Sequence, residues 1–159
     1  MIRLLLVSAI ALVFAGAASA QRVHAYRLEA LTVGDAQVTA SFNGAPTAEA
    51  MFTVSNAGYT PDKLVSASCW CAQSVELHRM WMDHGIMRMR SAPDGLDVPA
   101  GGQLKLTKDG DHLMLIGLKR PLKAGQRVKI TLRFQHNGAA TLDFPVVDTA
   151  PAAPMHMKM

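Results

Sequence analysis

The stretch VKITLRFQHNGAATLDFPVV, residues 128–147, decides the fold class of this chain. Apolar side chains occupy every second position of 128–134 and again of 142–146. This period-two pattern is typical of strands that bury one face against a core. Asn137 and Gly138, between the two segments, favour the tight turn of a β-hairpin. The stretch therefore predicts two half-buried antiparallel strands.

The rest of the chain repeats these signs of β-structure. Residues 47–54 form another expected strand, which ends in a turn at 56–58, and turns rich in Gly, Pro and Asp recur at 93–95 and 109–111. No segment has a convincing amphipathic pattern of ten or more helical residues. Short strands separated by such turns indicate an all-β sandwich or a small barrel.

The two ends of the chain differ from this central part. Residues 1–20 combine a basic start, an apolar run and an Ala-x-Ala cleavage site, which is typical of a removed signal peptide. The apolar run is too short to span a bilayer, and Gln21 stands where a bacterial lipoprotein would have Cys. We therefore expect one soluble domain over 21–147 in the periplasm, with no membrane span after signal removal. Residues 148–159 are expected to form a flexible tail.

Charge and composition exclude several classes of function. The formal net charge is +4, and the charges are dispersed, without a run of five or six of one sign. This distribution gives little support to nucleic-acid binding or to a polybasic membrane contact. No nucleophile–base pair and no pair of carboxylates stands out, so an enzyme is not expected.

Methionine and histidine gather in three clusters, at residues 78–89, 112–114 and 155–159. Methionines that merely fill a core would be scattered among leucines and valines. Thioether and imidazole together suit a soft ion such as Cu(I), because neither ligand has to lose a proton from a charged form. The clusters therefore predict a copper site.

Strand geometry brings some of these ligands together. His112 and Met114 are two residues apart and face the same way, while the leucines beside them point into the core. Gly85 permits a tight turn, so residues 78–82 and 86–90 are expected to form a hairpin with neighbouring thioethers.

Several side chains of this hairpin have more than one interpretation. Met80 and Met82 either line the surroundings of a site or the core, or bind metal themselves, and we keep Met80 as a secondary ligand. Met87 is expected in the core, and His84 on the surface of the turn. Trp81 either shields the site or is buried.

Cys69 and Cys71 are two residues apart in a chain that is expected to be exported. In an oxidising compartment the pair is not expected to remain as free thiols. If both lay on one strand, their Cα atoms would be ~6.6 Å apart, near the upper limit for a disulfide, and a direct bridge would be strained. An inert oxidised pair, a redox-active pair, an extra copper site and intermolecular disulfides all remain open.

The spacing of His78, ten residues, Met89, 22 residues and then His112-x-Met114 resembles a known signature. It is that of the periplasmic copper chaperones (PCuAC-like) that supply the binuclear Cu(A) centre of cytochrome c oxidase. The resemblance covers roughly residues 47–147, and its flanking segments are 98–102, 112–118, 121–125 and 132–134. The chain departs from the family in a second spacer one residue longer than usual, in Asp111 before the histidine, and in the Cys69-Trp70-Cys71 element.

This resemblance implies a cupredoxin-like or immunoglobulin-like Greek-key β-sandwich with a Cu(I) site. The implied ligands are His78, Met89, His112 and Met114. The implied copper acceptor is the Cu(A) subunit of cytochrome c oxidase or a dithiol copper-insertion protein. A tail that takes Cu(II) in some relatives would here use Met155, His156, Met157 and Met159.

Three other functions compete with this copper carrier. A periplasmic copper-buffering or resistance protein would use the same ligands without a dedicated acceptor. A redox or electron-transfer protein of the blue-copper kind needs a Cys thiolate with two histidines, and no cysteine stands near His112. A metal-free exported binding module would leave the His–Met spacing as coincidence.

Overall fold

The computed structural model of the chain describes residues 25–41 and 44–148. The predicted signal peptide and all but the first residue of the predicted tail lie outside them. The described part consists of strands joined by turns and loops: β1 (Tyr26–Leu28), β2 (Leu31–Thr39), β3 (Thr47–Asn56), β4 (Asp62–Cys69), β5 (Ala72–Asp83), β6 (Ile86–Ser91), β7 (Leu96–Val98), β8 (Gln103–Leu106), β9 (His112–Leu118), β10 (Arg127–Phe134) and β11 (Ala139–Val147).

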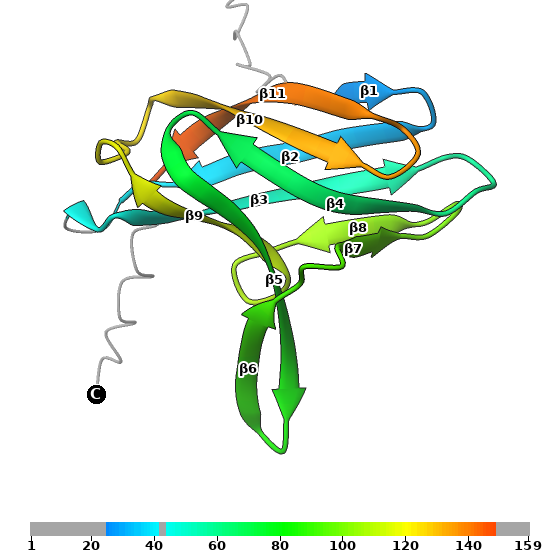
Figure 1. Ribbon diagram of the computed structural model, residues 1–159, viewed down its shortest axis with the longest axis horizontal. Helices are drawn as coiled ribbons and strands as arrows, with labels where there is room; N and C mark the ends of the chain where they lie inside the picture. The colour runs from blue at the N-terminus through cyan, green and yellow to red at the C-terminus, as the bar shows by residue number, and fades with distance from the viewer. Residues whose placement is uncertain (1–24, 42–43, 149–159) are drawn as a thin grey trace, which may run out of the picture.

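The strands form a sheet that folds over on itself into a β-sandwich (Figure 1). Hydrogen bonds link them in the order β6-β5-β9-β3-β2-β11-β10-β4-β7, with β1 beside β2 and β8 beside β3. The predicted hairpin of residues 128–147 is present as β10 and β11, in a register from Arg127 opposite Pro145 to Arg133 opposite Ala139. β11 also pairs in parallel with β2, which joins the two layers. The prediction of an all-β sandwich is confirmed.

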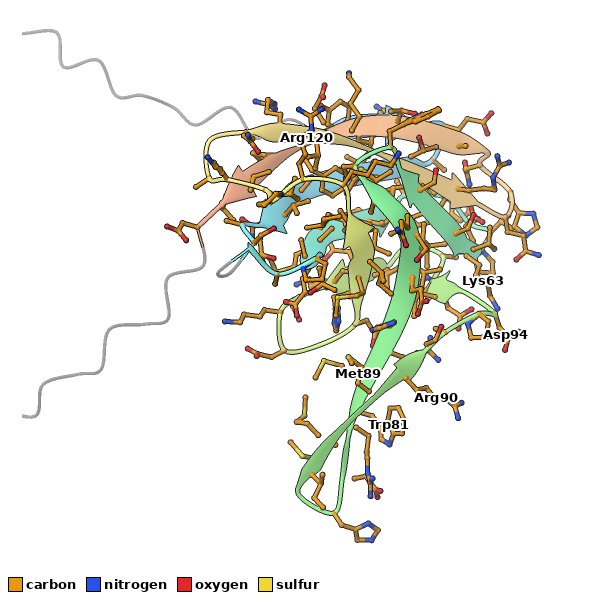
Figure 2. The ribbon with its side chains drawn as sticks, turned by 60° about the vertical axis from the view of Figure 1, so that its left-hand side comes forward. Lys63, Trp81, Met89, Arg90, Asp94 and Arg120 are labelled. Carbon is orange, nitrogen blue, oxygen red and sulfur yellow. A yellow bond between two sulfur atoms is a disulfide. The ribbon has the colours of Figure 1, made fainter. Side chains whose placement is uncertain are left out.

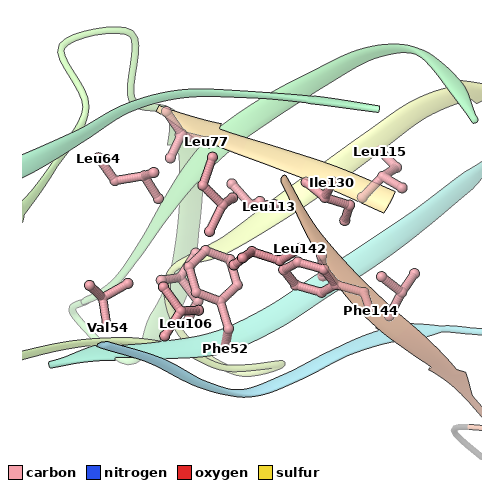
Figure 3. Packing of buried hydrophobic residues seen from close by; sticks show 14 of the residues in the cluster. Phe52, Val54, Leu64, Leu77, Leu106, Leu113, Leu115, Ile130, Leu142 and Phe144 are labelled. Carbon is pink, nitrogen blue, oxygen red and sulfur yellow. The ribbon is translucent and has the colours of Figure 1, made fainter. Parts of the chain in front are cut away.

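The alternating apolar residues meet in a single core between the layers (Figure 3). Every apolar side chain at alternate positions of 128–134 and 142–146 is buried. Phe52 of β3 and Phe144 of β11 meet edge to face across this core, with ring centroids 5.6 Å apart. The core therefore fixes the strands on which the candidate ligands lie.

Asp62, at the start of β4, fastens the β10–β11 turn to the sandwich. Its Oδ1 accepts hydrogen bonds from the backbone N–H groups of Lys63 (2.7 Å) and His136 (2.9 Å). Its Oδ2 accepts from the backbone N–H and side-chain amide of Asn137, at 3.1 and 2.7 Å. Burial raises the pKa of Asp62, but these hydrogen bonds stabilise the charged form and hold the pKa below its usual value.

The strand β5 belongs to two parts of the molecule. Its first half pairs with β9 inside the sandwich, whereas residues 78–83 pair with β6. Residues 79–91 project away from the sandwich as a two-stranded hairpin, which we call the hairpin arm (Figure 1). At its tip His84 and Gly85 have φ angles of 48° and 81°, and two consecutive positive φ angles are those of a type I′ hairpin turn. The predicted hairpin is therefore present.

Across residues 25–41 and 44–148, no helix has the length and hydrophobicity needed to cross a membrane.

Candidate metal centre

Two histidines on neighbouring strands form the centre of the candidate site. His78 of β5 lies directly opposite His112 of β9 in the antiparallel register. The centroids of their rings are 5.5 Å apart, and the two residues are only 9% and 2% exposed. Leu77 and Leu113, which alternate with them, are buried in the core on the other face of the sheet, as the strand geometry predicts.

Each histidine has one ring nitrogen engaged and the other without a partner. Nδ1 of His112 lies 2.8 Å from the carbonyl oxygen of Gly110, which can only accept, so Nδ1 carries the proton. Nε2 of His78 donates in the same way to the carboxylate of Glu76, at 3.1 Å. Nδ1 of His78 and Nε2 of His112 are buried, and neither has a hydrogen-bond partner in the described part of the chain.

These two partnerless nitrogens fit a metal site. Buried polar atoms are nearly always hydrogen-bonded, so two such atoms on facing rings need an explanation. Metal-binding histidines usually donate their other N–H to a carboxylate or a backbone carbonyl, which fixes the tautomer and the ring orientation. His78 and His112 both follow this pattern. Each therefore keeps one buried ring nitrogen with a free lone pair, on rings whose centroids are 5.5 Å apart.

The two predicted methionine ligands flank the histidine pair on the same face. Met114 is two residues beyond His112 on β9, and Met89 lies on β6 opposite Met80, which is two residues beyond His78. Directly paired residues share a face, as do residues two apart on one strand. Met114 is partly buried, whereas Met89 is 50% exposed. The register therefore brings all four predicted ligands to one face of β9, β5 and β6, open toward solvent at Met89.

Three supporting groups were not predicted from the sequence. Glu76 and the Gly110 carbonyl orient the two histidines, as described above. Asp111 accepts a hydrogen bond from the backbone N–H of Met80 at 3.0 Å, and its other oxygen lies 3.8 Å from Nε of Arg79. The carboxylate of Asp111, at which the chain departs from the family signature, is thus partnered by an arginine. Glu76 left a signal in the sequence, because it precedes His78 by two residues and so shares its face, and Asp111 was noted only as a departure from the family signature.

The hairpin arm corrects two expectations and confirms a third. Met87, expected in the core, is 44% exposed, because the arm extends beyond the sandwich and no second layer covers it. Trp81 neither shields the site nor is buried: it is 41% exposed, and its alternation with Met80 places it on the opposite face. Its ring stacks under Arg90, 5.8 Å from the guanidinium carbon. His84 is on the surface of the turn, as predicted.

Cys69 and Cys71 form a disulfide with a Cα separation of 5.1 Å. The expected separation of ~6.6 Å was wrong, because β4 ends at Cys69 and the chain turns at Trp70 and Cys71. With a separation inside the ordinary disulfide range, the reason for expecting a strained bridge is removed. The pair lies before the first residue of β5, whereas His78 is in the middle of that strand, and no thiol remains free to join the histidines.

Two hollows of the surface lie beside the disulfide rather than at the histidine pair. One, of about 550 Å³, lies beside the disulfide and is lined by Trp70, Lys119 and Lys129, among others. Within the described residues, no three side chains of His, Cys, Asp or Glu come together as a metal cluster. The donor set of the candidate site is therefore two imidazoles with neighbouring thioethers, which suits a soft ion. Because a metal ion needs donor atoms rather than a deep cavity, the position of the candidate site is given by the two imidazoles and the thioethers beside them.

Comparison with known proteins identifies the family of this chain. A family model described as "Putative lipoprotein LpqE-like" matches residues 31–146. The chain belongs to the LpqE-like family. It is also 38% identical over 99 residues to a protein of Leifsonia xyli subsp. xyli named "Putative lipoprotein Lxx21020". That match covers 62% of this chain and 60% of the curated relative, so the chain spans about three fifths of that protein's length.

Several solved structures are similar to this LpqE-like chain. It is 32% identical to apo-DR1885 from Deinococcus radiodurans, over 93% of this chain and 97% of that one, with a TM-score of 0.59. Its identity to the Cu(I) form of DR1885 is 37%, over 82% of each chain, with a TM-score of 0.56. The copper-bound PCuAC domain of PmoF2 is 21% identical over 79% of this chain and 98% of that domain, and its TM-score of 0.68 shows the shared fold. The predicted membership of the PCuAC-like copper chaperone family is confirmed.

Proposed function

We propose that this LpqE-like protein carries Cu(I) in the periplasm and delivers it to a cuproprotein. The ion is bound by Nδ1 of His78, Nε2 of His112 and the thioethers of Met89 and Met114. The observation that carries the proposal is the pair of buried ring nitrogens without partners on one face of two paired strands. Copper-bound relatives of the same fold support it.

The ligand set suits a carrier better than a permanent site. All four donors are neutral, so they leave the charge of Cu(I) uncompensated, whereas thiolates add charge neutralisation to soft donation. Met89 is half exposed, so an incoming ligand can reach the ion from that side. Copper is therefore expected to pass to an acceptor with cysteine ligands. The proposed acceptor is the Cu(A) subunit of cytochrome c oxidase or a dithiol copper-insertion protein.

We further propose that the exported form is soluble. The names of the relatives refer to lipoproteins, but this sequence has Gln at position 21, and its two cysteines are joined to each other.

The tail of residues 148–159 is proposed as a second copper site in which His156 binds Cu(II), because imidazole suits Cu(II) better than thioether does. Deletion of the tail should abolish Cu(II) binding and leave the Cu(I) site intact; Cu(II) binding at full affinity without the tail would remove it from the proposal.

Anaerobic titration with Cu(I) tests the ligand set. Met114→Leu keeps the volume of the side chain but removes the sulfur, so the fold should survive. Its affinity for Cu(I) should fall by at least about tenfold, since loss of a group outside the ligand shell alone costs about 10–100-fold. Met51→Leu makes the same change at a buried residue of β3 and should bind like the wild type. Unchanged affinity in Met114→Leu would refute the assignment.

Mixing the copper-loaded protein with an equal amount of the reduced Cu(A) subunit tests the direction of transfer. A carrier gives up its copper under these conditions. Retention of the ion would favour the alternative function, a copper buffer without a dedicated acceptor.

A further inference from the structure

We propose that Met82 and Met87 form a second Cu(I) site at the tip of the hairpin arm, through which copper enters and leaves the His–Met centre. The proposal rests on the proposed function, because it takes the histidine pair as the destination of the ion. It concerns two residues that the spacing signature of the family leaves out.

The register of the arm arranges its thioethers as successive pairs. Met82 lies opposite Met87, and Met80 lies opposite Met89. Residues two apart on one strand share a face, so both pairs lie on the same face as His78. Directly opposite side chains have Cβ atoms ~4.5–5.5 Å apart, close enough for two flexible thioethers to share an ion.

Packing does not account for these methionines. Met82 is 62% exposed and Met87 44% exposed, whereas Met51 on β3 is 7% exposed. Residues that stabilise a core are removed from water, and these are not. The arm has two strands and projects beyond the second layer of the sandwich (Figure 1).

The two faces of the arm differ in charge. The face that carries the thioethers consists of alternate residues of the two strands, and none of them is an arginine, a lysine or a carboxylate. They are His78, Met80, Met82, Met87, Met89 and Ser91. The opposite face carries the arginines, of which Arg88 is 3.3 Å from the Asp83 carboxylate and Arg90 stacks on Trp81. Figure 2 shows Trp81 and Arg90 together on one side of the arm. A cation on the methionine face is thus kept apart from the positive charges.

The spacing of the pairs allows an ion to move inward step by step. Adjacent pairs are two residues apart, about 6.6–6.8 Å along the strand, and methionine has three rotatable bonds and a polarizable sulfur. At each step the ion exchanges one thioether for another and remains Cu(I), so no electron or proton is transferred. Two exposed thioethers should bind more weakly than two imidazoles with two thioethers. The ion therefore moves from the tip toward the histidines.

Labelling the methionine methyl groups with ¹³C tests the tip site. The protein is titrated with Ag(I), a soft ion that does not change its oxidation state in air, and then with Cu(I) under anaerobic conditions. The first equivalent should shift the methyl signals of Met89 and Met114, and a further equivalent those of Met82 and Met87. The methyl signals of the tail methionines are separate, so ion bound there is not mistaken for ion at the tip.

Met82→Leu/Met87→Leu supplies the functional arm of the test, with Met51→Leu as the matched control. The double variant should bind the first equivalent at wild-type affinity, with the same shifts of the Met89 and Met114 methyl signals as the wild type. It should also transfer Cu(I) more slowly to the chelator bathocuproine disulfonate, whereas the control behaves like the wild type. Static methyl signals of Met82 and Met87 under excess Ag(I), or wild-type transfer by the double variant, would overturn the proposal. Absence of the first equivalent would instead refute the proposed function.

Discussion

The sandwich core and the hairpin arm both contain large apolar side chains, but the core buries them and the arm leaves them exposed. Phe52 and Phe144 are 1% and 0% exposed, whereas Met82 and Ile86 in the arm are 62% and 58% exposed. In the core, removal from water stabilises the fold. In the arm the methionines stay exposed to water, so they should contribute little to stability, and the proposed function assigns their sulfur atoms to an ion. Whether a methionine stabilises the fold therefore depends on whether a second layer of the sandwich covers its side chain.

If burial is what separates the two regions, a substitution in the core should lower the free energy of unfolding much more than one in the arm. Phe144→Ala removes a fully buried ring that meets Phe52 edge to face, and it should lower the free energy of unfolding by about 3–5 kcal/mol. Ile86→Thr in the arm removes exposed apolar surface, and it should stay within about 0.5 kcal/mol. Chemical denaturation measures both variants. Losses of similar size would mean that the arm is packed against something and is not a free projection.

Asp62 is a stronger polar anchor for the sandwich than Asp111 is for the arm, because Asp62 accepts four hydrogen bonds and Asp111 accepts one, from the backbone N–H of Met80. Asp62→Ala removes a carboxylate that accepts four hydrogen bonds, and it should cost about 2–4 kcal/mol. The folded-state pKa is lowered, so this contribution is present above the unfolded value of about 3.9 and is lost as pH falls through the folded value. Denaturation curves of the wild type and Asp62→Ala should therefore converge as the pH is lowered through this range. A difference that stays constant down to the acid limit would contradict the role of the charge.

The smallest expected effect on stability is that of a substitution at Glu76, which should change Cu(I) affinity but not the fold. Glu76 accepts a hydrogen bond from His78 and is partly exposed, so Glu76→Ala should hardly change stability. It should weaken Cu(I) binding by about 10–100-fold, because His78 loses the group that fixes its tautomer and orientation. Glu76→Gln keeps a carbonyl acceptor and should recover part of the affinity. An anaerobic competition titration that finds Glu76→Ala unchanged would show that Glu76 does not position the ligand.

The sequence predicted the parts of the molecule that follow strand periodicity. Alternation in 128–134 predicted β10, and the two-residue spacing of His112 and Met114 predicted their shared face. Glu76 as an anchor could not be predicted, because its role depends on where the His78 ring points. The exposure of Met87 was missed because periodicity gives the face of a strand but not whether a second layer covers it. The separation of Cys69 and Cys71 was missed because periodicity does not show that the strand ends at Cys69 and that the chain then turns.

Nitrogen-15 NMR of the histidine rings tests the central claim most directly, namely that His78 and His112 bind Cu(I) through the two nitrogens that lack partners. In the metal-free protein, long-range ¹H–¹⁵N spectra should show the proton on Nε2 of His78 and on Nδ1 of His112. One equivalent of Cu(I) or Ag(I) should then shift Nδ1 of His78 and Nε2 of His112 and leave the two protonated nitrogens protonated. Shifts at the other nitrogen of either ring, or unchanged signals for both rings after one equivalent is bound, would contradict the account.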